Sequence, residues 1–234
     1  MGFLTGKTAL ITGAGRAVLQ DGSCGSIGYG IATAYAKEGA NLVITGRNVK
    51  KLEEAKDELE RLYSIKVLTV QADVCAGGDN EATVQNVVKQ AVETFGSIQV
   101  LINNAQASAS GVPLADNTTE QFDLALYSGL YAAFYYMKAC YPYLKESHGS
   151  VINFASGAGL FGNFGQSAYA AAKEGIRGLS RVAATEWGAG WHQRQRGLPA
   201  GMDGQAGTVP AGLPGCVQSQ CKNAAHGALR QRRD

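Results

Sequence analysis

The chain has 234 residues, 45% of them hydrophobic, and a formal net charge of only +2. This length allows one α/β domain with a sizeable core, and so small a net charge gives no general case for binding nucleic acid or a membrane surface. No apolar stretch approaches the roughly 20 residues of a membrane span. The five cysteines are scattered without a C-x-x-C pair, and no signal peptide precedes the first strand-like run. Reduced thiols and the missing signal favour a cytoplasmic protein.

Short apolar runs alternate with helical patterns along residues 7–187. We expect strands at 8–12, 41–45, 66–70, 100–102 and 150–154, and helices at 27–38, 50–63, 80–95, 120–145 and 169–187. This alternation predicts an α/β fold with a Rossmann-type, doubly wound parallel sheet. Such sheets bind ligands beyond the carboxyl ends of their strands, so residues at those ends are the candidates for a site.

A glycine-rich segment follows the first predicted strand. After an unusually long loop over residues 17–24, it leads into the next predicted helix. Glycines at this place allow a tight turn and let a pyrophosphate approach the helix N-terminus closely. The alternative is a flexible glycine loop without a ligand. The residues that we assign here to dinucleotide binding are Gly13, Arg16, Ser26, Ile27 and Gly28.

The ends of the next three predicted strands carry further candidate binding residues. The second ends in Gly46-Arg47 with no carboxylate. An Arg there accommodates a 2′-phosphate, whereas an acidic residue binds the ribose 2′-hydroxyl, so NADP is favoured over NAD. The alternative for Arg47 is a solvated loop cation. Asp73-Val74 follows the third strand, where a carboxylate can accept a hydrogen bond from an adenine amino group or cap a turn. The amides of Asn103-Asn104, after the fourth strand, can tie neighbouring strand ends together and line the cofactor cleft.

Three residues near the last predicted helix are candidates for proton transfer. Ser156 follows the fifth predicted strand, and Tyr169 and Lys173 form a Y-x-x-x-K pattern that places both on one helix face. An ammonium beside a phenol favours the phenolate and pulls the phenol pKa below its usual value of about 10. Such a Tyr can exchange a proton with a carbinol oxygen near neutral pH, and the Ser hydroxyl can hold that oxygen. Alone, however, Y-x-x-x-K also occurs by chance in ordinary helices.

In their order and spacing over residues 5–187, these motifs resemble the classical short-chain dehydrogenase/reductase family. The resemblance implies a Rossmann fold, a nicotinamide cofactor, no metal, and hydride transfer between an alcohol and a ketone or aldehyde. It implies that Tyr169 is the general acid/base, that Lys173 lowers the pKa of Tyr169 and binds the nicotinamide ribose, and that Ser156 orients the substrate oxygen.

The sequence departs from the family pattern at two positions before the tail. Gln106 stands where the family has a glycine after Asn-Asn-Ala, and Gly129 stands where it has an Asn that holds a proton-relay water. We therefore expect an altered or absent relay. The glycine loop also resembles that of enoyl reductases, but those enzymes space Tyr and Lys by seven residues, which favours carbonyl/alcohol chemistry here.

The composition changes after residue 187. Residues 188–234 contain no Ile, Phe, Tyr or Glu, and they do not continue the family's next strand, G-I-x-V-N-x-x-x-P-G. Codons can be chosen for residues 190–203 that, read one base later, give D-G-I-N-V-N-V-V-C-P-L-A-W. We interpret the tail as a frameshift product that starts near Gly188 or Ala189; the alternative is a genuinely divergent tail.

This interpretation predicts an SDR-like dinucleotide-binding domain over residues 1–187 and a non-family tail over 188–234. We expect the last strands of the sheet to be missing or disrupted, the tail to be largely disordered over 190–234, and stability or activity to be low.

Two functions follow from these patterns. The first is an NADP-dependent oxidoreductase that acts on a small alcohol or ketone; the second is a non-catalytic dinucleotide-binding or vestigial protein. The resemblance also implies a homodimer or homotetramer built on the helices at 120–145 and 169–187. Nucleic-acid binding through Arg230-Gln231-Arg232-Arg233 is a third alternative, but such a charge run is more simply a solvated tail.

Overall fold

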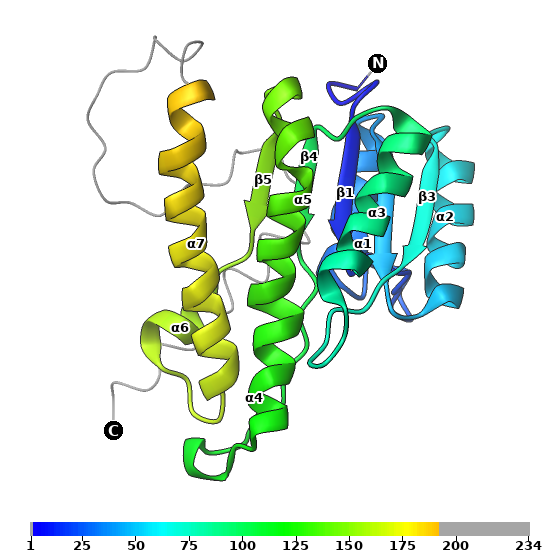
Figure 1. The fold of residues 1–234 in the computed structure, drawn as a ribbon. Coiled ribbons are helices and arrows are strands. Elements are labelled where there is room, and N and C mark those ends of the chain that lie inside the picture. The colour runs from blue at the N-terminus through cyan, green and yellow to red at the C-terminus, as the bar shows by residue number, and fades with distance from the viewer. Residues whose placement is uncertain (1, 192–234) are drawn as a thin grey trace, which may run out of the picture.

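A five-stranded parallel sheet forms the centre of the molecule (Figure 1). The computed structural model describes residues 2–191; residue 1 and residues 192–234 lie outside the described part. The strands are β1 (Thr8–Thr12), β2 (Asn41–Gly46), β3 (Val67–Gln71), β4 (Val100–Asn103) and β5 (Ser150–Asn153). They are arranged in the order β3-β2-β1-β4-β5, and all are parallel. The chain begins at the central strand β1, adds β2 and β3 on one side of it, and then crosses to add β4 and β5 on the other side. The carboxyl ends of β1 and β4 therefore form the switch point at which such sheets bind ligands.

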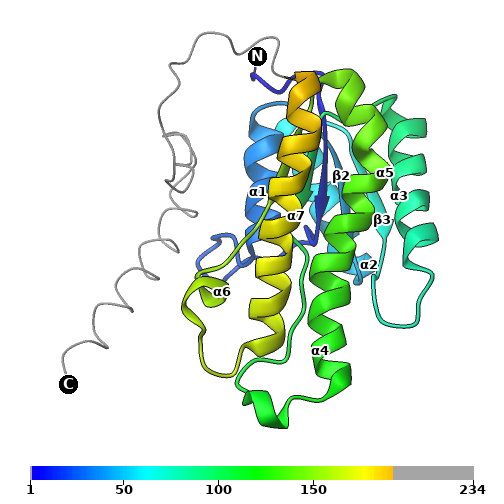
Figure 2. The ribbon, with the colours of Figure 1, turned by 60° about the vertical axis from the view of Figure 1, so that its left-hand side comes forward.

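Helices cover both faces of the sheet. The helical segments of the described residues are α1 (Ile27–Lys37), α2 (Val49–Tyr63), α3 (Asn80–Phe95), η1 (Leu114–Asp116), α4 (Thr119–Ala125), η2 (Leu126–Tyr131), α5 (Ala132–Ser147), α6 (Gly157–Phe161) and α7 (Ser167–Trp191). On one face, α1 and α2 pack in a buried cluster with Ile11 of β1. On the other face, α3, α5 and α7 share a second cluster with Leu10, the neighbouring residue of the same strand. Figure 2 shows α5 and α7 running alongside each other in this second layer.

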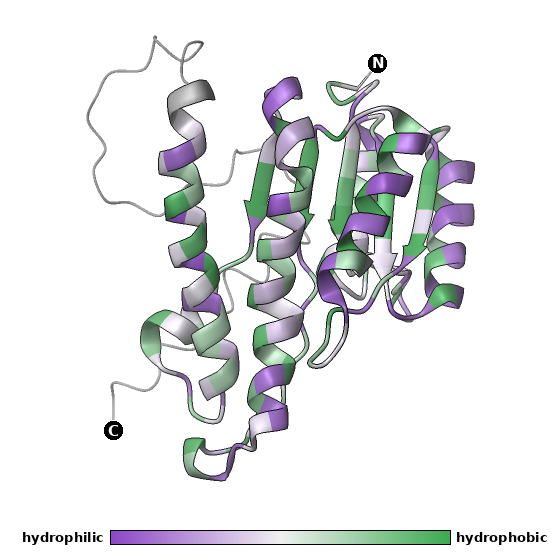
Figure 3. Ribbon diagram, in the orientation of Figure 1, coloured by the Kyte–Doolittle hydropathy of each residue, from purple (hydrophilic) through white to green (hydrophobic). Residues whose placement is uncertain are grey.

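Both faces of the inner strands are buried because side chains alternate between the two layers. All five residues of β1 are buried. In Figure 3 the strands are mostly hydrophobic, whereas α2 and α3 carry hydrophilic residues on the side turned away from the sheet. This arrangement is the one expected for a parallel sheet sandwiched between amphipathic helices.

Capping side chains start the helices that follow β1, β2 and β3. Ser26, Asn48 and Asp79 each accept a hydrogen bond from the backbone N–H three residues further on. Each of these side chains satisfies one of the N–H groups that the first helical turn leaves without an intrahelical acceptor. The N-termini of α1 and α2 are thereby fixed beside the carboxyl ends of the central strands.

The predicted α/β architecture is confirmed, and eight of the ten predicted elements end within one residue of the observed bounds. The helix predicted at 120–145 is instead α4, a π-helical turn η2, and α5. The five-residue helix α6 was not predicted, because so short a segment carries no periodic signal. Helix α7 begins two residues earlier than predicted and continues to Trp191, past the proposed domain boundary at residue 187.

Disorder is predicted over 190–234, but residues 190 and 191 belong to α7. The rest of that prediction concerns residues 192–234, outside the described part of the chain. The proposed frameshift origin from Gly188 or Ala189 remains a prediction. None of the helices within residues 2–191 is both long and apolar enough to cross a membrane.

Candidate active site

The glycine segment after β1 lies close against the start of α1. Gly13 has a φ of +71°, a conformation that favours glycine. A Cβ on Gly28 would lie 2.2 Å from the Gly13 carbonyl oxygen and 2.6 Å from the Asn104 amide nitrogen. Only a glycine therefore fits at position 28, where α1 lies directly against the loop backbone and the Asn104 amide.

Asn104 and Thr12 join the ends of β4 and β1. The Asn104 amide donates to the Thr12 carbonyl at 2.9 Å and to the Gly13 carbonyl at 3.3 Å. In return, the Thr12 hydroxyl accepts hydrogen bonds from the backbone N–H groups of Asn104 and Ala105, each at 3.0 Å. These four contacts hold the glycine loop at the switch point. Asn104 lies where the sequence predicted it, whereas the part played by Thr12 was not anticipated.

Arg16 is held by an ion pair with Glu58 of α2. The Glu58 carboxylate raises the pKa of Arg16, and the Arg16 hydrogen bond lowers the pKa of Glu58. The Arg16 backbone N–H also donates to the Lys51 carbonyl at 2.7 Å. Both contacts fasten the glycine loop to α2. Glu58 gave no signal in the sequence, because it belongs to the regular charged face of an amphipathic helix.

The other predicted binding residues surround this loop. Ser26 is the N-cap of α1, and Ile27, the first residue of that helix, is 48% exposed. Arg47 is exposed directly after β2. Asp73 is also exposed, two residues beyond β3, while Val74 is buried. These residues thus lie at the carboxyl ends of three neighbouring strands, and Arg47 is accessible to an anionic ligand.

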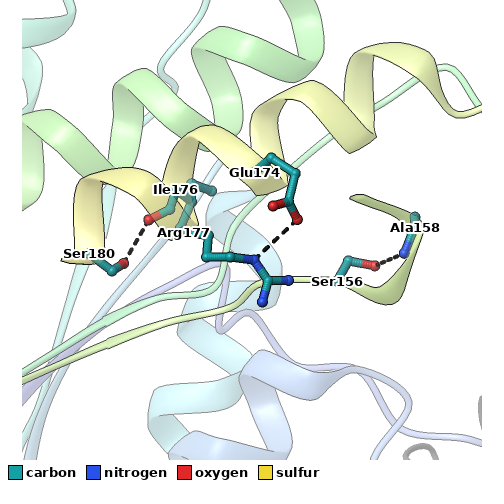
Figure 4. Close-up of polar contacts among 6 residues, drawn as sticks. All are labelled: Ser156, Ala158, Glu174, Ile176, Arg177 and Ser180. Carbon is teal, nitrogen blue, oxygen red and sulfur yellow. Dashed lines mark hydrogen bonds and ion pairs between the residues drawn. The ribbon is translucent and has the colours of Figure 1, made fainter. Parts of the chain in front are cut away.

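Ser156 caps α6 and is shown in Figure 4. Its hydroxyl oxygen accepts a hydrogen bond from the Ala158 backbone N–H at 3.2 Å, a contact that does not use the O–H as a donor. Helix α6 packs tightly on α7, since a Cβ on Gly159 would lie 2.4 Å from a Glu174 carboxylate oxygen. This contact brings the segment that carries Ser156 onto the first half of α7.

Tyr169 and Lys173 lie one turn apart on α7. The Lys173 ammonium is 5.4 Å from the centre of the Tyr169 ring. Lys173 is only 5% exposed, and this burial lowers its pKa to about 8. Among the described residues, no carboxylate forms an ion pair with this ammonium; the neighbouring Glu174 instead binds Arg177 at 3.2 Å (Figure 4). The buried cation is therefore directed toward the phenol rather than neutralised by a carboxylate.

A chain of amides and hydroxyls connects the sheet to this helix. The Asn103 amide donates to Asn153 at 2.8 Å, which ties β4 to β5, and the Asn153 amide donates to the Ser180 hydroxyl of α7 at 2.8 Å. Ser180 in turn donates to the carbonyl one turn earlier in α7, at Ile176 (Figure 4). The predicted role of the Asn103 amide in linking strand ends is confirmed, and its extension through Asn153 to α7 is new.

The residues present fit a dinucleotide. A glycine cradle that a single Cβ would fill lies at the N-terminus of an 11-residue helix, and the exposed cation of Arg47 follows the adjacent strand. A metal has no comparable place: within residues 2–191 no group of three or more His, Cys, Asp or Glu side chains is arranged to hold one.

Comparison with known proteins identifies relatives over most of the chain. The family described as short chain dehydrogenase matches residues 7–190. A 12alpha-hydroxysteroid dehydrogenase from Clostridium sp. is 66% identical over 188 residues, which are 80% of this chain and 70% of that protein. A 3-oxoacyl-[acyl-carrier-protein] reductase from Staphylococcus epidermidis is 31% identical over 225 residues, which cover 96% of this chain and 80% of the relative.

Solved structures agree with this result. A NAD+-bound xylitol dehydrogenase superposes with a TM-score of 0.71 at 28% identity, covering 80% of this chain and 67% of the other. A metagenomic short-chain oxidoreductase in complex with NADP superposes with a TM-score of 0.70 at 27% identity, covering 80% of this chain and 79% of the other. Nicotinamide dinucleotides of both kinds thus occur among the neighbours of this fold.

Proposed function

Because this chain belongs to the short-chain dehydrogenase family, we propose that it transfers a hydride between NADP(H) and a substrate carbon that carries a hydroxyl or carbonyl oxygen. The observation that carries this proposal is the buried Lys173 ammonium, 5.4 Å from the Tyr169 ring and without a carboxylate partner among the described residues. A buried cation beside a phenol favours the phenolate, which is the form needed to take a proton from an alcohol.

Three side chains divide the work on the substrate oxygen. When bound, the nicotinamide cofactor supplies or accepts the hydride. Ser156 donates its O–H to the substrate oxygen while Ala158 N–H holds the hydroxyl oxygen in place. Tyr169 gives a proton to that oxygen during reduction and takes it back during oxidation. Lys173 stabilises the phenolate of Tyr169 and donates to the nicotinamide ribose, since its ammonium has three N–H groups.

The cofactor assignment to NADP rests on charge at the end of β2. Arg47 is exposed there, and neither of the two residues that close this strand, Thr45 and Gly46, is acidic. An arginine in this place suits a 2′-phosphate. Arg16 supplies a second cation in the glycine loop, although Glu58 holds it in the described structure. Gly13, Ser26, Ile27 and Gly28 would cradle the pyrophosphate, and Asp73, Val74 and Asn104 would line the adenine and ribose side.

The substrate class is proposed from one relative. At 66% identity over 188 residues, the 12alpha-hydroxysteroid dehydrogenase supports a hydroxysteroid as the alcohol and the corresponding ketosteroid as the carbonyl compound. A homo-oligomer is proposed from exposed apolar residues on the helices that the family resemblance implicates, namely Phe134, 42% exposed, on α5 and Val182, 54% exposed, on α7.

A second function, dinucleotide binding without turnover, is supported by the open side of the sheet. Within residues 2–191, β5 pairs only with β4, and Ile152 on this strand is 37% exposed. A substrate held beside α6 and α7 would have little cover from the described residues. In this second function the protein would bind the dinucleotide but would not catalyse hydride transfer.

The test uses the purified full chain. NADPH and NADH binding are measured by fluorescence, and turnover is measured with 12-ketosteroids, 12α-hydroxysteroids and a panel of simple ketones. NADPH-dependent reduction supports the first function, and tight binding without turnover supports the second. Failure to bind either nucleotide would contradict both. The nucleotide sequence across the codons for Trp187–Trp191 separately decides the frameshift interpretation.

A further inference from the structure

Gln106 places a buried amide behind the proposed catalytic residues. It lies three residues after β4, and its side-chain nitrogen donates to the Ala125 carbonyl at the start of η2, at 3.4 Å. Its side-chain oxygen Oε1 is fully buried and accepts no hydrogen bond from any residue in the described part of the chain. A buried acceptor without a donor is costly, so an oxygen held in this way is expected to meet a donor in the working protein.

The Gln106 amide occupies the space above Gly129. A Cβ on Gly129 would lie 2.6 Å from the amide carbon of Gln106 and 2.7 Å from its nitrogen. These two positions, far apart in the sequence, are those at which the chain departs from the family pattern before its tail. The structure shows that they are one local arrangement: the side chain missing at position 129 leaves room for the amide that arrives from position 106.

The loop that carries Gln106 is fixed to η2 at a second point. The Ala107 backbone N–H donates to the Ser128 hydroxyl at 2.9 Å, and that hydroxyl contacts the Ala107 carbonyl at 3.1 Å. These contacts fix the backbone from which the Gln106 side chain extends, and the Ala125 carbonyl holds the amide itself. Single π-helical turns such as η2 are rare and often occur at functional sites.

Helix η2 also packs on α7. A Cβ on Gly175 would lie 2.7 Å from the Leu130 side chain, so η2 and α7 are in direct contact two residues beyond Lys173. A shift of η2 would be transmitted to the segment of α7 that holds Lys173. Contacts therefore run from Gln106 to Gly129 and from the adjacent Leu130 to Gly175 of α7.

We propose that Gln106 is a positioning residue that holds η2 against α7, and that an enclosed water molecule donates a hydrogen bond to its Oε1 and links it to the Lys173 ammonium. This role rests on the proposed function. Gln106 does not touch the substrate; it keeps the ammonium oriented toward Tyr169 and stabilises its charged form. The Gln106 amide, which extends from the loop after β4, thereby takes the role that a polar side chain at position 129 of η2 would otherwise have.

The test is an exchange of the two positions. Gln106→Gly is expected to lower kcat by about 10- to 100-fold, in line with small displacements of catalytic groups, and to shift the basic limb of the pH profile. The KM for NADPH should stay within about twofold. Gly129→Asn alone is expected to lower both kcat and the melting temperature, because its side chain collides with the Gln106 amide. The double variant Gln106→Gly/Gly129→Asn, which returns an amide to the same space, should recover kcat and the pH limb to within about threefold of the original protein.

Ala109→Gly is the matched control, since it adds the same backbone freedom to this loop and leaves the Gln106 amide in place. A loss of melting temperature in Gln106→Gly with kcat and the pH profile unchanged would show a structural role only and overturn the inference. A double variant no better than either single variant would overturn it as well.

If the original protein shows no turnover, the proposed function fails, but this inference is still decided by NADPH binding. The pH dependence of the NADPH dissociation constant reports the charge of Lys173, and Gln106→Gly must shift its midpoint while Ala109→Gly must not. An unchanged midpoint would contradict the inference.

Discussion

The two ends of the sheet differ in how completely the described residues enclose them. On the nucleotide side, β1 is buried along its whole length and β2 is buried at its four central residues. At the other end, β5 alternates between exposed and half-buried residues, and Leu160, Phe161 and Phe164 near α6 are 58%, 78% and 83% exposed. Both ends carry residues of the same proposed reaction, yet only one has a closed core.

This difference distinguishes the part of the sheet proposed to bind the nucleotide from the part proposed to carry out proton transfer. The proposed nucleotide site depends on contacts that lie wholly within the described residues, such as those among Gly13, Gly28 and Asn104. Tyr169, the proposed proton-transfer group, is also present, but nearby residues such as Phe161 and Phe164 are exposed. We therefore expect nucleotide binding to be the more robust property, and the following changes test this, from the largest expected effect to the smallest.

Removal of the Tyr169 hydroxyl should separate the two properties most clearly. Tyr169→Phe is expected to lower turnover by about 100- to 10,000-fold, the range of general acid–base catalysis, because the variant lacks the hydroxyl that exchanges the proton in the proposed reaction. NADPH affinity should change less than about twofold. Steady-state kinetics and fluorescence titration measure both. Tyr63→Phe on α2 is the control and should alter neither; equal losses in both variants would contradict the role of Tyr169.

Two isoleucines on adjacent strands measure the difference in burial directly. Ile102 of β4 and Ile152 of β5 are paired in register, but Ile102 is fully buried while Ile152 is 37% exposed. Ile102→Ala should lower the free energy of unfolding by about 2–5 kcal/mol, and Ile152→Ala by about 1 kcal/mol. Urea unfolding followed by circular dichroism gives both values. An equal cost at Ile152 would mean that it is covered by a second subunit or by residues outside the described part, and the open end would then be closed.

Two glycines of α1 test the close approach at the nucleotide site. Gly28→Ala forces a methyl group against the Gly13 carbonyl, and we expect a loss of about 1–3 kcal/mol in stability together with weaker NADPH binding. At Gly30 the nearest atom to an added Cβ is 3.6 Å away, so Gly30→Ala should be neutral or stabilise the helix by up to about 1 kcal/mol. Thermal melts with and without NADPH distinguish the two. Equal losses in both variants would contradict the close contact between Gly28 and the Gly13 carbonyl.

Lys173 should make stability depend on pH in the alkaline range. Burial lowers its pKa in the folded protein to about 8, below the unfolded value of about 10.4. Below about pH 8 the folded state holds an unfavourable buried charge; between about pH 8 and 10 it has released the proton that the unfolded chain still binds, so this group raises stability as pH rises. Lys173→Met should therefore be more stable than the original protein at pH 7, and the difference should disappear near pH 10. In the original protein, turnover should fall as pH rises through about 8. A difference in stability that does not depend on pH would contradict this assignment.

Local patterns predicted the framework of this molecule but not the contacts between its elements. Strands and helices with strong periodicity, such as 8–12 and 80–95, were predicted to the residue. The π-helical turn was missed because its apolar spacing continues that of the flanking α-helices. The loop residue Gln106 was recognised as unusual, but its contact with Gly129 is set by tertiary packing that no local pattern encodes. The pairing of Arg16 with Glu58 was hidden for the same reason.

Glu58 gives the smallest but most specific test of the nucleotide side. Its ion pair with Arg16 is partly exposed, so Glu58→Gln should cost at most about 1 kcal/mol of stability, and in the original protein that contribution is lost as pH falls through the lowered pKa of Glu58. Release of the Arg16 guanidinium toward the cofactor should improve NADPH binding relative to NADH by about threefold to tenfold, because one charge-assisted hydrogen bond to the 2′-phosphate becomes available. Glu54→Gln, one turn away on the same helix, removes the same charge without touching this hydrogen bond and should change the ratio by less than about twofold. An unchanged ratio in Glu58→Gln would mean that Arg47 alone sets the preference and that Arg16 serves to fasten the glycine loop to α2. In that case the contacts that pack the glycine loop against α2 would not determine whether the protein prefers NADPH or NADH.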